Sequence, residues 1–171
     1  MKANIELKAR LDDIRTVREV AERIATEPSQ VIHQVDTYFS VENGRLKMRV
    51  IDGREGQLVW YFRPDVADSK ESRYLVTPIA AWRDVQETLA GANGVLCCVT
   101  KRREVSMFRN VRIHLDRVEN LGEFLEFEAV LGPDCDARQG LELVNYLRGE
   151  FAIRDDQLIE GSYSDLLLAE S

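Results

Sequence analysis

The chain has 171 residues, which is enough to bury a substantial hydrophobic core and is most simply explained by one domain over residues 1–171. Its 44% hydrophobic and 31% charged residues are typical of a soluble globular protein, and its formal net charge of −7 argues against a nucleic-acid partner bound by overall charge. We expect no signal peptide or membrane partner, because no apolar run approaches the roughly 20 residues that cross a bilayer.

The first part of the chain predicts strands joined by one helix and tight turns. Asp12 and Asp13 begin an amphipathic helix after the first strand, and Asn43-Gly44 is typical of a hairpin turn. Pro64 ends a further strand, because proline has no N–H to donate to a sheet. The strands predicted here cover residues 2–9, 31–39, 45–51 and 58–63.

The rest of the chain adds further strands and two helices. One helix opens at Pro78 and reaches Leu89, and another follows Pro133 and runs through Leu147. The pattern predicts an α+β protein with about eight antiparallel strands and helices after the first, fifth and eighth. The strands of this part cover residues 71–76 and most of 95–130, with breaks near 107–110 and 120–122.

Many of these strands carry a charged side chain at every second position. Period-two alternation predicts strands with one polar and one apolar face. Such polar faces often meet solvent, but here carboxylates and cations gather on different strands. This sorting favours an eight-stranded antiparallel β-barrel or tunnel with a charged lumen and with helices packed on its apolar outer face.

Carboxylates on two neighbouring strands form a candidate metal site. Glu126 and Glu128 share one strand face and lie about 7 Å apart along it. Asp116, on the preceding strand, is placed to supply a third carboxylate. Carboxylate oxygens are the ligands of hard cations, so we expect Mg²⁺ or Mn²⁺ as the cofactor and no zinc.

Lysine and arginine side chains form an opposite set. Inward-facing cations repel one another unless they are paired or occupied, and phosphate oxygens would satisfy them, with bidentate contacts from arginine. The alternative is a solvated surface role for each cation. The main candidates are Lys47, Arg49, Lys101 and Arg103, and the secondary ones are Arg63, Arg73 and Arg112.

The remaining reactive residue types give weaker signals. His114 shares the face of Asp116, where it either lines the polar face or acts as a base or a partner of a metal ligand. Cys97, Cys98 and Cys135 have neither zinc spacing nor an evident disulfide partner. Unpaired cysteines suit a reducing compartment, so we expect a cytoplasmic protein.

At these motifs the chain resembles the CYTH superfamily, the triphosphate tunnel metalloenzymes that include class IV adenylate cyclases and thiamine triphosphatases. Asn4-Ile5-Glu6-Leu7-Lys8 is similar to the Glu-x-Glu-x-Lys motif of that family, with Asn4 in place of the first Glu. The segment 114–128 resembles the class IV cyclase branch in particular. Other similar segments are 45–49, 101–103 and the Ser-Tyr-x-x-Leu-like residues 161–167.

The resemblance implies a tunnel that is open at both ends and a role for each motif residue. It makes Glu6, Asp116, Glu126 and Glu128 metal ligands. It makes Lys8, Lys47, Arg49, Lys101 and Arg103 triphosphate ligands, among which Lys8, Lys101 and Arg103 would be catalytic by absorbing charge on the phosphates.

Three functions remain open from the sequence. The first is a class IV type of adenylate cyclase that converts ATP to cyclic AMP and pyrophosphate. The second is a hydrolase of inorganic tripolyphosphate, a nucleoside triphosphate or thiamine triphosphate. The third, which Asn4 favours as a weaker metal ligand than a carboxylate, is a non-catalytic binder of a phosphorylated metabolite. The expected partner is a small-molecule triphosphate, and a homodimer stays open.

Overall fold

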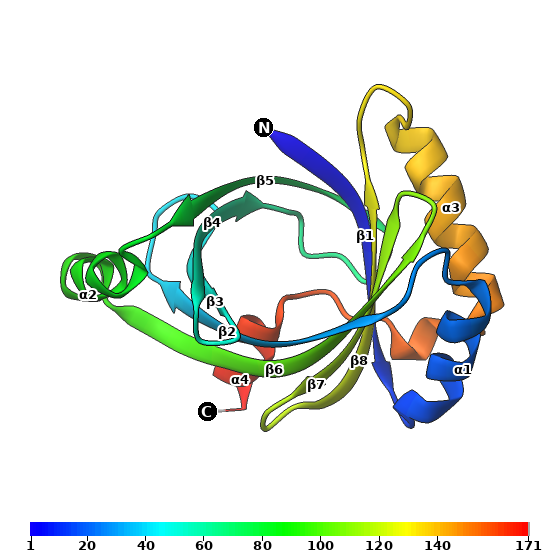
Figure 1. The fold of residues 1–171 in the computed structure, drawn as a ribbon, viewed down its shortest axis with the longest axis horizontal. Coiled ribbons are helices and arrows are strands. Elements are labelled where there is room, and N and C mark those ends of the chain that lie inside the picture. Colours follow the sequence, from blue (N-terminus) through cyan, green and yellow to red (C-terminus); the bar gives the residue numbers. More distant parts are fainter. Residues whose placement is uncertain (171) are drawn as a thin grey trace.

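Strands that pair edge to edge form a closed antiparallel barrel in the computed structural model, which describes residues 1–170 (Figure 1). The order around the barrel is β1-β5-β4-β3-β2-β6-β7-β8, and β8 pairs with β1 to close it. The strands are β1 (Lys2–Leu11), β2 (Gln30–Phe39), β3 (Arg45–Ile51), β4 (Glu55–Phe62), β5 (Lys70–Ile79), β6 (Val95–Phe108), β7 (Val111–Val118) and β8 (Gly122–Val130). The predicted α+β barrel with outer helices is therefore confirmed.

Apart from the C-terminal one, the helices cover two opposite sides of the barrel (Figure 1). Those within the described residues are α1 (Ile14–Ile24), α2 (Trp82–Asn93), α3 (Ala137–Glu150) and α4 (Tyr163–Ala169), with a short 3₁₀ turn, η1 (Asp155–Gln157). Asp13 caps α1 by accepting a hydrogen bond from the Arg15 backbone N–H, as expected for a helix that begins there. None of these helices is long and apolar enough to cross a membrane.

Alternation along the strands separates an outer apolar face from an inner polar one. Leu7 of β1 and Phe127 of β8 point outward and pack with Val144 and Leu147 of α3 in the largest hydrophobic cluster. Met48 of β3 joins a smaller cluster beneath α2. Because the helices bury the outer faces, the charged residues between these positions face the barrel interior.

The start of α2 differs from the sequence prediction. Pro78 lies within β5, opposite Gln57 of β4, and the helix begins only at Trp82. Proline is tolerated there because β1 pairs with β5 only as far as Tyr74, so no neighbouring strand requires an N–H from Pro78 on that side.

The C-terminal segment packs across one end of the barrel. Leu166 and Leu167 of α4 join a cluster with Val99 of β6 and Phe124 of β8, two side chains that share the inner face of their strands. Tyr163, at the start of α4, stacks on Phe124 with ring centroids 4.9 Å apart. The C-terminal segment therefore lies against inner-face residues at one end of the barrel.

Candidate functional site

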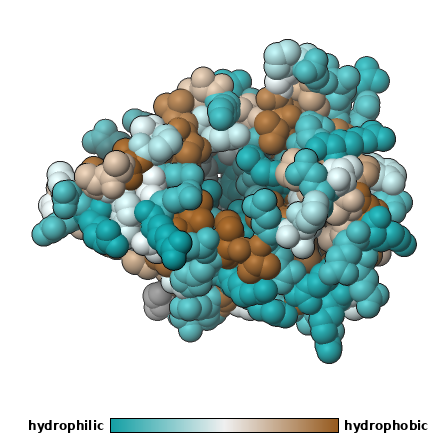
Figure 2. Space-filling model, in the orientation of Figure 1, coloured by the Kyte–Doolittle hydropathy of each residue, from teal (hydrophilic) through white to brown (hydrophobic). Residues whose placement is uncertain are grey.

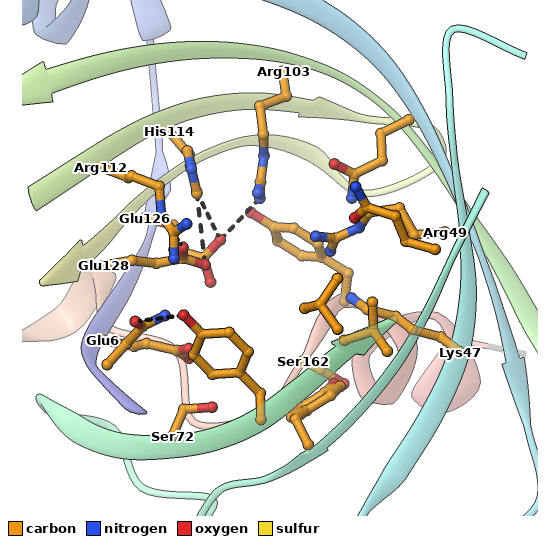
Figure 3. Close-up of a pocket in the computed structure, with 18 of the residues that line it drawn as sticks. Glu6, Lys47, Arg49, Ser72, Arg103, Arg112, His114, Glu126, Glu128 and Ser162 are labelled. Atoms are coloured by element: carbon orange, nitrogen blue, oxygen red, sulfur yellow. Dashed lines mark hydrogen bonds and ion pairs between the residues drawn. The ribbon is translucent and has the colours of Figure 1, made fainter. Parts of the chain in front are cut away.

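The barrel encloses a cavity of about 390 Å³, which is visible as a hollow in Figure 2 and is drawn in Figure 3. This volume lies within the usual range for small-molecule sites. Its glutamates gather on one side, whereas Lys47 and Arg49 lie on the opposite side (Figure 3). The sequence-predicted residues that line it are Glu6, Lys8, Lys47, Arg49, Arg63, Lys101, Arg103, Arg112, Glu126 and Glu128.

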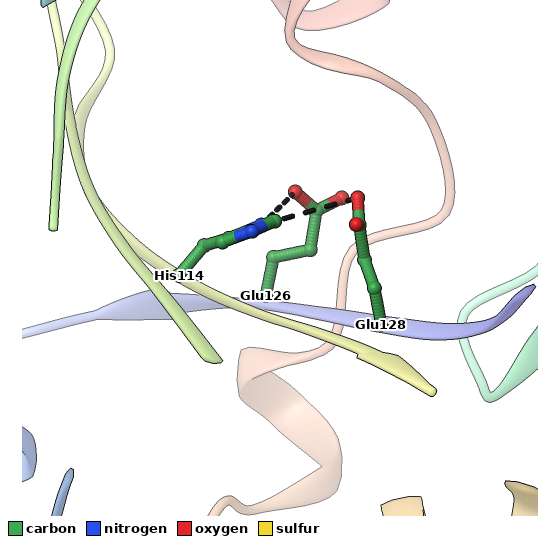
Figure 4. A group of neighbouring side chains, drawn as sticks. All are labelled: His114, Glu126 and Glu128. Atoms are coloured by element: carbon green, nitrogen blue, oxygen red, sulfur yellow. Dashed lines mark hydrogen bonds and ion pairs between the residues drawn. The ribbon is translucent and has the colours of Figure 1, made fainter. Parts of the chain in front are cut away.

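Two strands bring an imidazole and two carboxylates together (Figure 4). His114 of β7 pairs in register with Glu126 of β8, and its Nδ1 lies 3.3 Å from Glu126 Oε2. The same Nδ1 lies 3.9 Å from Glu128 Oε1. Donor atoms of these three residues all lie within 4.8 Å of one another.

Two cations also contact Glu126. Lys8 Nζ lies 3.1 Å from Glu126 Oε1, and Arg103 Nη2 donates to Glu126 Oε2 at 2.8 Å. Burial raises the pKa of the Glu126 carboxyl, but Lys8, His114 and Arg103 outweigh it, so that pKa lies well below its ordinary value. Glu126 therefore stays ionised in the interior.

Glu6 and Glu128 have opposite pKa shifts. Burial, followed by the charges of Glu128 and Glu126, raises the pKa of Glu6. Burial also opposes ionisation of Glu128, but His114 and Arg112 outweigh it and lower its pKa. Arg112 Nε lies 2.9 Å from Glu128 Oε2 in an ion pair.

Asp36, which the sequence did not single out, organises the cations of the opposite side. Its carboxylate accepts from Lys47 Nζ at 2.7 Å and from Arg49 Nε at 3.0 Å, and Lys101 Nζ lies 3.8 Å away. Burial raises the pKa of Asp36, but Arg49, Lys47 and Lys101 together bring it well below its ordinary value. One carboxylate thus faces three cations, which leaves a net positive charge.

Lys101 is a cation of the cavity whose pKa lies near neutrality. Its side chain is buried on the inner face of β6. Burial, with Arg103 nearby, lowers the pKa of Lys101 to about 7, although Asp36 and Asp116 act in the opposite direction.

Arg63 has hydrogen-bond donors that no protein group satisfies. Its Nη1 donates to Glu6 Oε2 at 3.1 Å, but Nε and Nη2 are buried without a partner among the described residues. An unsatisfied buried guanidinium is costly, and an anion in the cavity would satisfy it.

Two predicted site residues lie elsewhere. Arg73 faces outward because β5 turns residues 70, 72 and 74 inward; its side chain is 66% exposed and pairs with Glu71 at 2.9 Å. The triphosphate role predicted for Arg73 is therefore wrong.

Asp116 is buried behind the side chains that line the cavity and does not line it itself. Arg103 donates to both of its oxygens, at 2.7 Å and 2.6 Å, and the Tyr163 hydroxyl donates at 2.7 Å. Asp116 is completely buried and is not part of the group that His114 forms with the two glutamates. It fixes Arg103 and α4, so the structure does not support a role for it as a metal ligand.

Tyr163 was not predicted as a site residue, although its segment carries a motif. Lys8 Nζ lies 4.0 Å from the centre of its ring and Lys101 Nζ lies 4.9 Å from it, so two cations contact one aromatic ring. The ring forms part of the cavity floor next to Ser162.

Apolar side chains also line the cavity, towards the end away from α4. Along β6 the inward residues run from Val99 near α4 through Lys101 and Arg103 to Val105. Further inward apolar residues lie at the same end. We call this set the apolar arc; it consists of Ile32, Ile51, Val76 and Val105.

The donor set on the glutamate side fits a hard or borderline divalent cation. Glu126 and Glu128 are both held ionised, and each has an oxygen close to the same imidazole. Two carboxylates with a nitrogen donor are ordinary ligands of divalent ions. We expect Glu126 and Glu128 to hold such an ion, with Glu6 nearby.

Comparisons with known proteins agree with this fold. Residues 2–163 match the CYTH domain. No curated protein matches the sequence. A Pyrococcus horikoshii protein superposes with a TM-score of 0.84 at 22% identity, over 95% of this chain and 98% of that one.

Two further solved structures carry descriptions of activity. A candidate adenylate cyclase from Vibrio parahaemolyticus has a TM-score of 0.75 at 20% identity, over 96% of this chain and 97% of that one. A candidate adenylyl cyclase from Hippeastrum with a dominant triphosphatase activity has a TM-score of 0.68 at 12% identity, over 99% and 96% of the two chains. At these identities the likeness establishes the fold.

Proposed function

This chain belongs to the CYTH domain family, and we propose that it is a metal-dependent enzyme that cleaves a phosphorus–oxygen bond in a triphosphate bound inside the barrel. The observation that carries the proposal is one cavity in which cations face ionised carboxylates. Cations bind the phosphates, and carboxylates hold a divalent ion, so both requirements of the reaction meet in one space.

The cations differ in how freely they can bind phosphate. Arg63 has two buried donors without a partner, so its contact with a phosphate oxygen replaces no existing hydrogen bond at those atoms. Lys47, Arg49 and Lys101 share one carboxylate, Asp36, and keep surplus charge for a polyanion. The phosphates therefore belong between these side chains, towards the end at which α4 packs.

The reaction needs charge to be absorbed as the phosphorus–oxygen bond breaks. Lys8, Lys101 and Arg103 line the interior and supply fixed positive charge to the transferring or leaving phosphate. Arg103 is held in place by its paired contacts to Asp116, so little reorganisation is required of it. A bound Mg²⁺ or Mn²⁺ supplies Lewis-acid polarisation of phosphate oxygens.

The apolar arc favours a triphosphate that carries an organic group. Inorganic tripolyphosphate has no apolar group that could contact Ile32, Ile51 and Val105. A nucleobase would bury apolar surface against these residues. We therefore propose ATP as the first substrate to test, with conversion to cyclic AMP and pyrophosphate. The ribose 3′-hydroxyl then attacks the α-phosphorus, and pyrophosphate leaves.

Triphosphate hydrolysis is the second candidate. It is favoured by the Hippeastrum protein, which has the same fold and a dominant triphosphatase activity. In that reaction water attacks the terminal phosphorus, and the same cations stabilise the leaving group. The two reactions differ in which phosphorus the nucleophile reaches.

One experiment tests both candidates. Purified protein is incubated with Mg²⁺ or Mn²⁺ and with ATP, thiamine triphosphate or tripolyphosphate, and cyclic AMP, pyrophosphate and orthophosphate are separated. Cyclic AMP with equimolar pyrophosphate supports the cyclase, and orthophosphate supports the hydrolase. Tight binding of a triphosphate without formation of any product would overturn the proposal of an enzyme. It would instead support the third function, a non-catalytic binder of a phosphorylated metabolite.

A further inference from the structure

We propose that His114 is a direct ligand of the divalent cation, together with Glu126 and Glu128, and that the site therefore binds Mn²⁺ in preference to Mg²⁺. The inference rests on the proposed function, since it concerns the metal that the proposed reaction requires. It adds a nitrogen ligand to a site whose expected ligands were all carboxylates.

The first support is the spacing of the three donor atoms. Ligands that lie about 2.1 Å from one ion at right angles are about 3.0 Å apart, and at tetrahedral angles about 3.4 Å apart. His114 Nδ1 lies 3.3 Å from Glu126 Oε2 and 3.9 Å from Glu128 Oε1. The first distance already suits two ligands of one ion, and the second requires only a small rotation of Glu128.

The second support is how the carboxylate oxygens are shared. Glu126 turns Oε1 to Lys8 and Oε2 towards the imidazole, although Arg103 also contacts Oε2. Glu128 turns Oε2 to Arg112 and Oε1 towards the imidazole. Each glutamate thus presents one oxygen to the same small space, which Figure 4 shows in front of the His114 ring.

The third support is that strand pairing fixes the imidazole there. His114 lies on the inner face of β7, directly opposite Glu126 in the register of β7 and β8. Its side chain is only 5% exposed, so it has little freedom to turn towards solvent. A ligand held by two paired strands is pre-positioned for a cation.

The choice of metal follows from the nitrogen. Mg²⁺ selects oxygen ligands and loses its water reluctantly, whereas transition-metal ions accept imidazole nitrogen. Mn²⁺ accepts both carboxylate oxygen and imidazole nitrogen as ligands. An imidazole at this position therefore raises the affinity for Mn²⁺ more than the affinity for Mg²⁺.

Electron paramagnetic resonance of bound Mn²⁺ tests the assignment directly. The chain contains 2 histidines, and the other one, His33, is exposed on β2, so His33→Gln is a matched control. Electron spin-echo modulation from a coordinated ¹⁴N is expected in the unmodified protein and in His33→Gln, but not in His114→Gln. Titration should show Mn²⁺ binding weakened about tenfold or more by His114→Gln and Mg²⁺ binding changed less than twofold.

The outcomes separate this inference from the proposed function. If the protein binds both Mn²⁺ and tripolyphosphate but shows no nitrogen modulation, His114 is not a ligand of the ion. The proposed triphosphate site would then be retained. Binding of neither Mn²⁺ nor tripolyphosphate overturns both. If His114→Gln does not fold, the comparison of unmodified protein with ¹⁵N-histidine-labelled protein replaces it, since the modulation must change with the isotope.

Discussion

The hydroxyl of Tyr163 and the carboxylate of Asp116 are 2.7 Å apart, although 47 positions separate them in the chain. This hydrogen bond joins the first residue of α4 to the inner face of β7. It also completes the set of donors around a carboxylate that fixes Arg103. The helix at this end of the barrel is therefore connected through Asp116 to Arg103, a residue of the proposed site.

Tyr163→Phe should destabilise the protein by about 1.5–3 kcal/mol, because it removes a buried hydrogen bond to a charged group. The ring that contacts Lys8 and Lys101 is retained, so binding of tripolyphosphate should change little. Urea denaturation measures the free energy of unfolding. Tyr146→Phe, at a half-exposed position on α3, is the control; an equal effect of both variants would contradict the role of the Asp116 contact.

Glu126→Gln and Glu128→Gln should both abolish metal-dependent turnover, because each removes a charged ligand. Their effects on stability should differ. Glu126 is paired with Lys8 and Arg103, so its loss leaves buried cations unpaired and should cost about 3–5 kcal/mol. Glu128 is less deeply buried, and its ion pair is with the partly exposed Arg112, so a smaller cost is expected. Calorimetry without metal measures the difference in stability between the two variants. Retained metal-dependent turnover in both variants would refute the carboxylate site.

Arg63→Met should weaken tripolyphosphate binding by about tenfold or more, the equivalent of one charge-assisted hydrogen bond. Arg73→Met removes the same charge from the outer face and should change the dissociation constant less than twofold. Isothermal titration calorimetry at one salt concentration compares them. Equal losses would mean that net charge, rather than the unpaired donors of Arg63, governs binding.

Triphosphate affinity should fall as the pH rises above 7. Burial brings the pKa of Lys101 to about 7, and only its protonated form attracts phosphate, so binding takes up a proton. The loss should approach tenfold between pH 7.5 and 8.5, where the protonated fraction of Lys101 falls by almost that factor. Lys101→Arg stays charged throughout and should show a flatter profile. The same slope in both proteins would assign the titration to another group.

Asn4→Glu should weaken metal-free binding of tripolyphosphate about tenfold. The Asn4 amide satisfies its neighbours when its Oδ1 is turned to Arg112: in that orientation Oδ1 accepts from Arg112 at 3.2 Å, and Nδ2 donates to the Ala3 carbonyl oxygen at 3.0 Å and to the Tyr74 hydroxyl at 3.1 Å. A carboxylate adds a charge close to the polyanion, and the repulsion is on the order of 1–4 kcal/mol. Turnover of both forms with Mg²⁺ and Mn²⁺ decides the matter, since a faster Glu form would show that Asn4 impairs the site.

Alternation along single strands was enough to predict the barrel interior, because the direction of a side chain depends only on its position in its own strand. Lys47, Arg49 and Glu126 face inward for that reason. Arg73 was misplaced because residues 71–76 do not alternate, so their sequence gives no inner or outer face. Pro78 was misread because its tolerance depends on where β1 stops pairing.

Asp36 shows what local patterns leave out. It follows Gln34 at period two on β2, which is the signal that could have marked it. Its importance comes from Lys47 and Arg49 on β3 and from Lys101 on β6. Strand order around the barrel determines these neighbours, and the sequence does not state that order.

The proposed cyclase reaction would have a kinetic consequence in this cavity. A nucleotide bound with its phosphates towards α4 and its base against the apolar arc would leave pyrophosphate, once formed, on the α4 side of the nucleoside product. We then expect the cyclic nucleotide to leave first, past the apolar arc, and pyrophosphate to leave last. In that reaction pyrophosphate should be a competitive product inhibitor against ATP, and sustained turnover would depend on how fast the surroundings remove it.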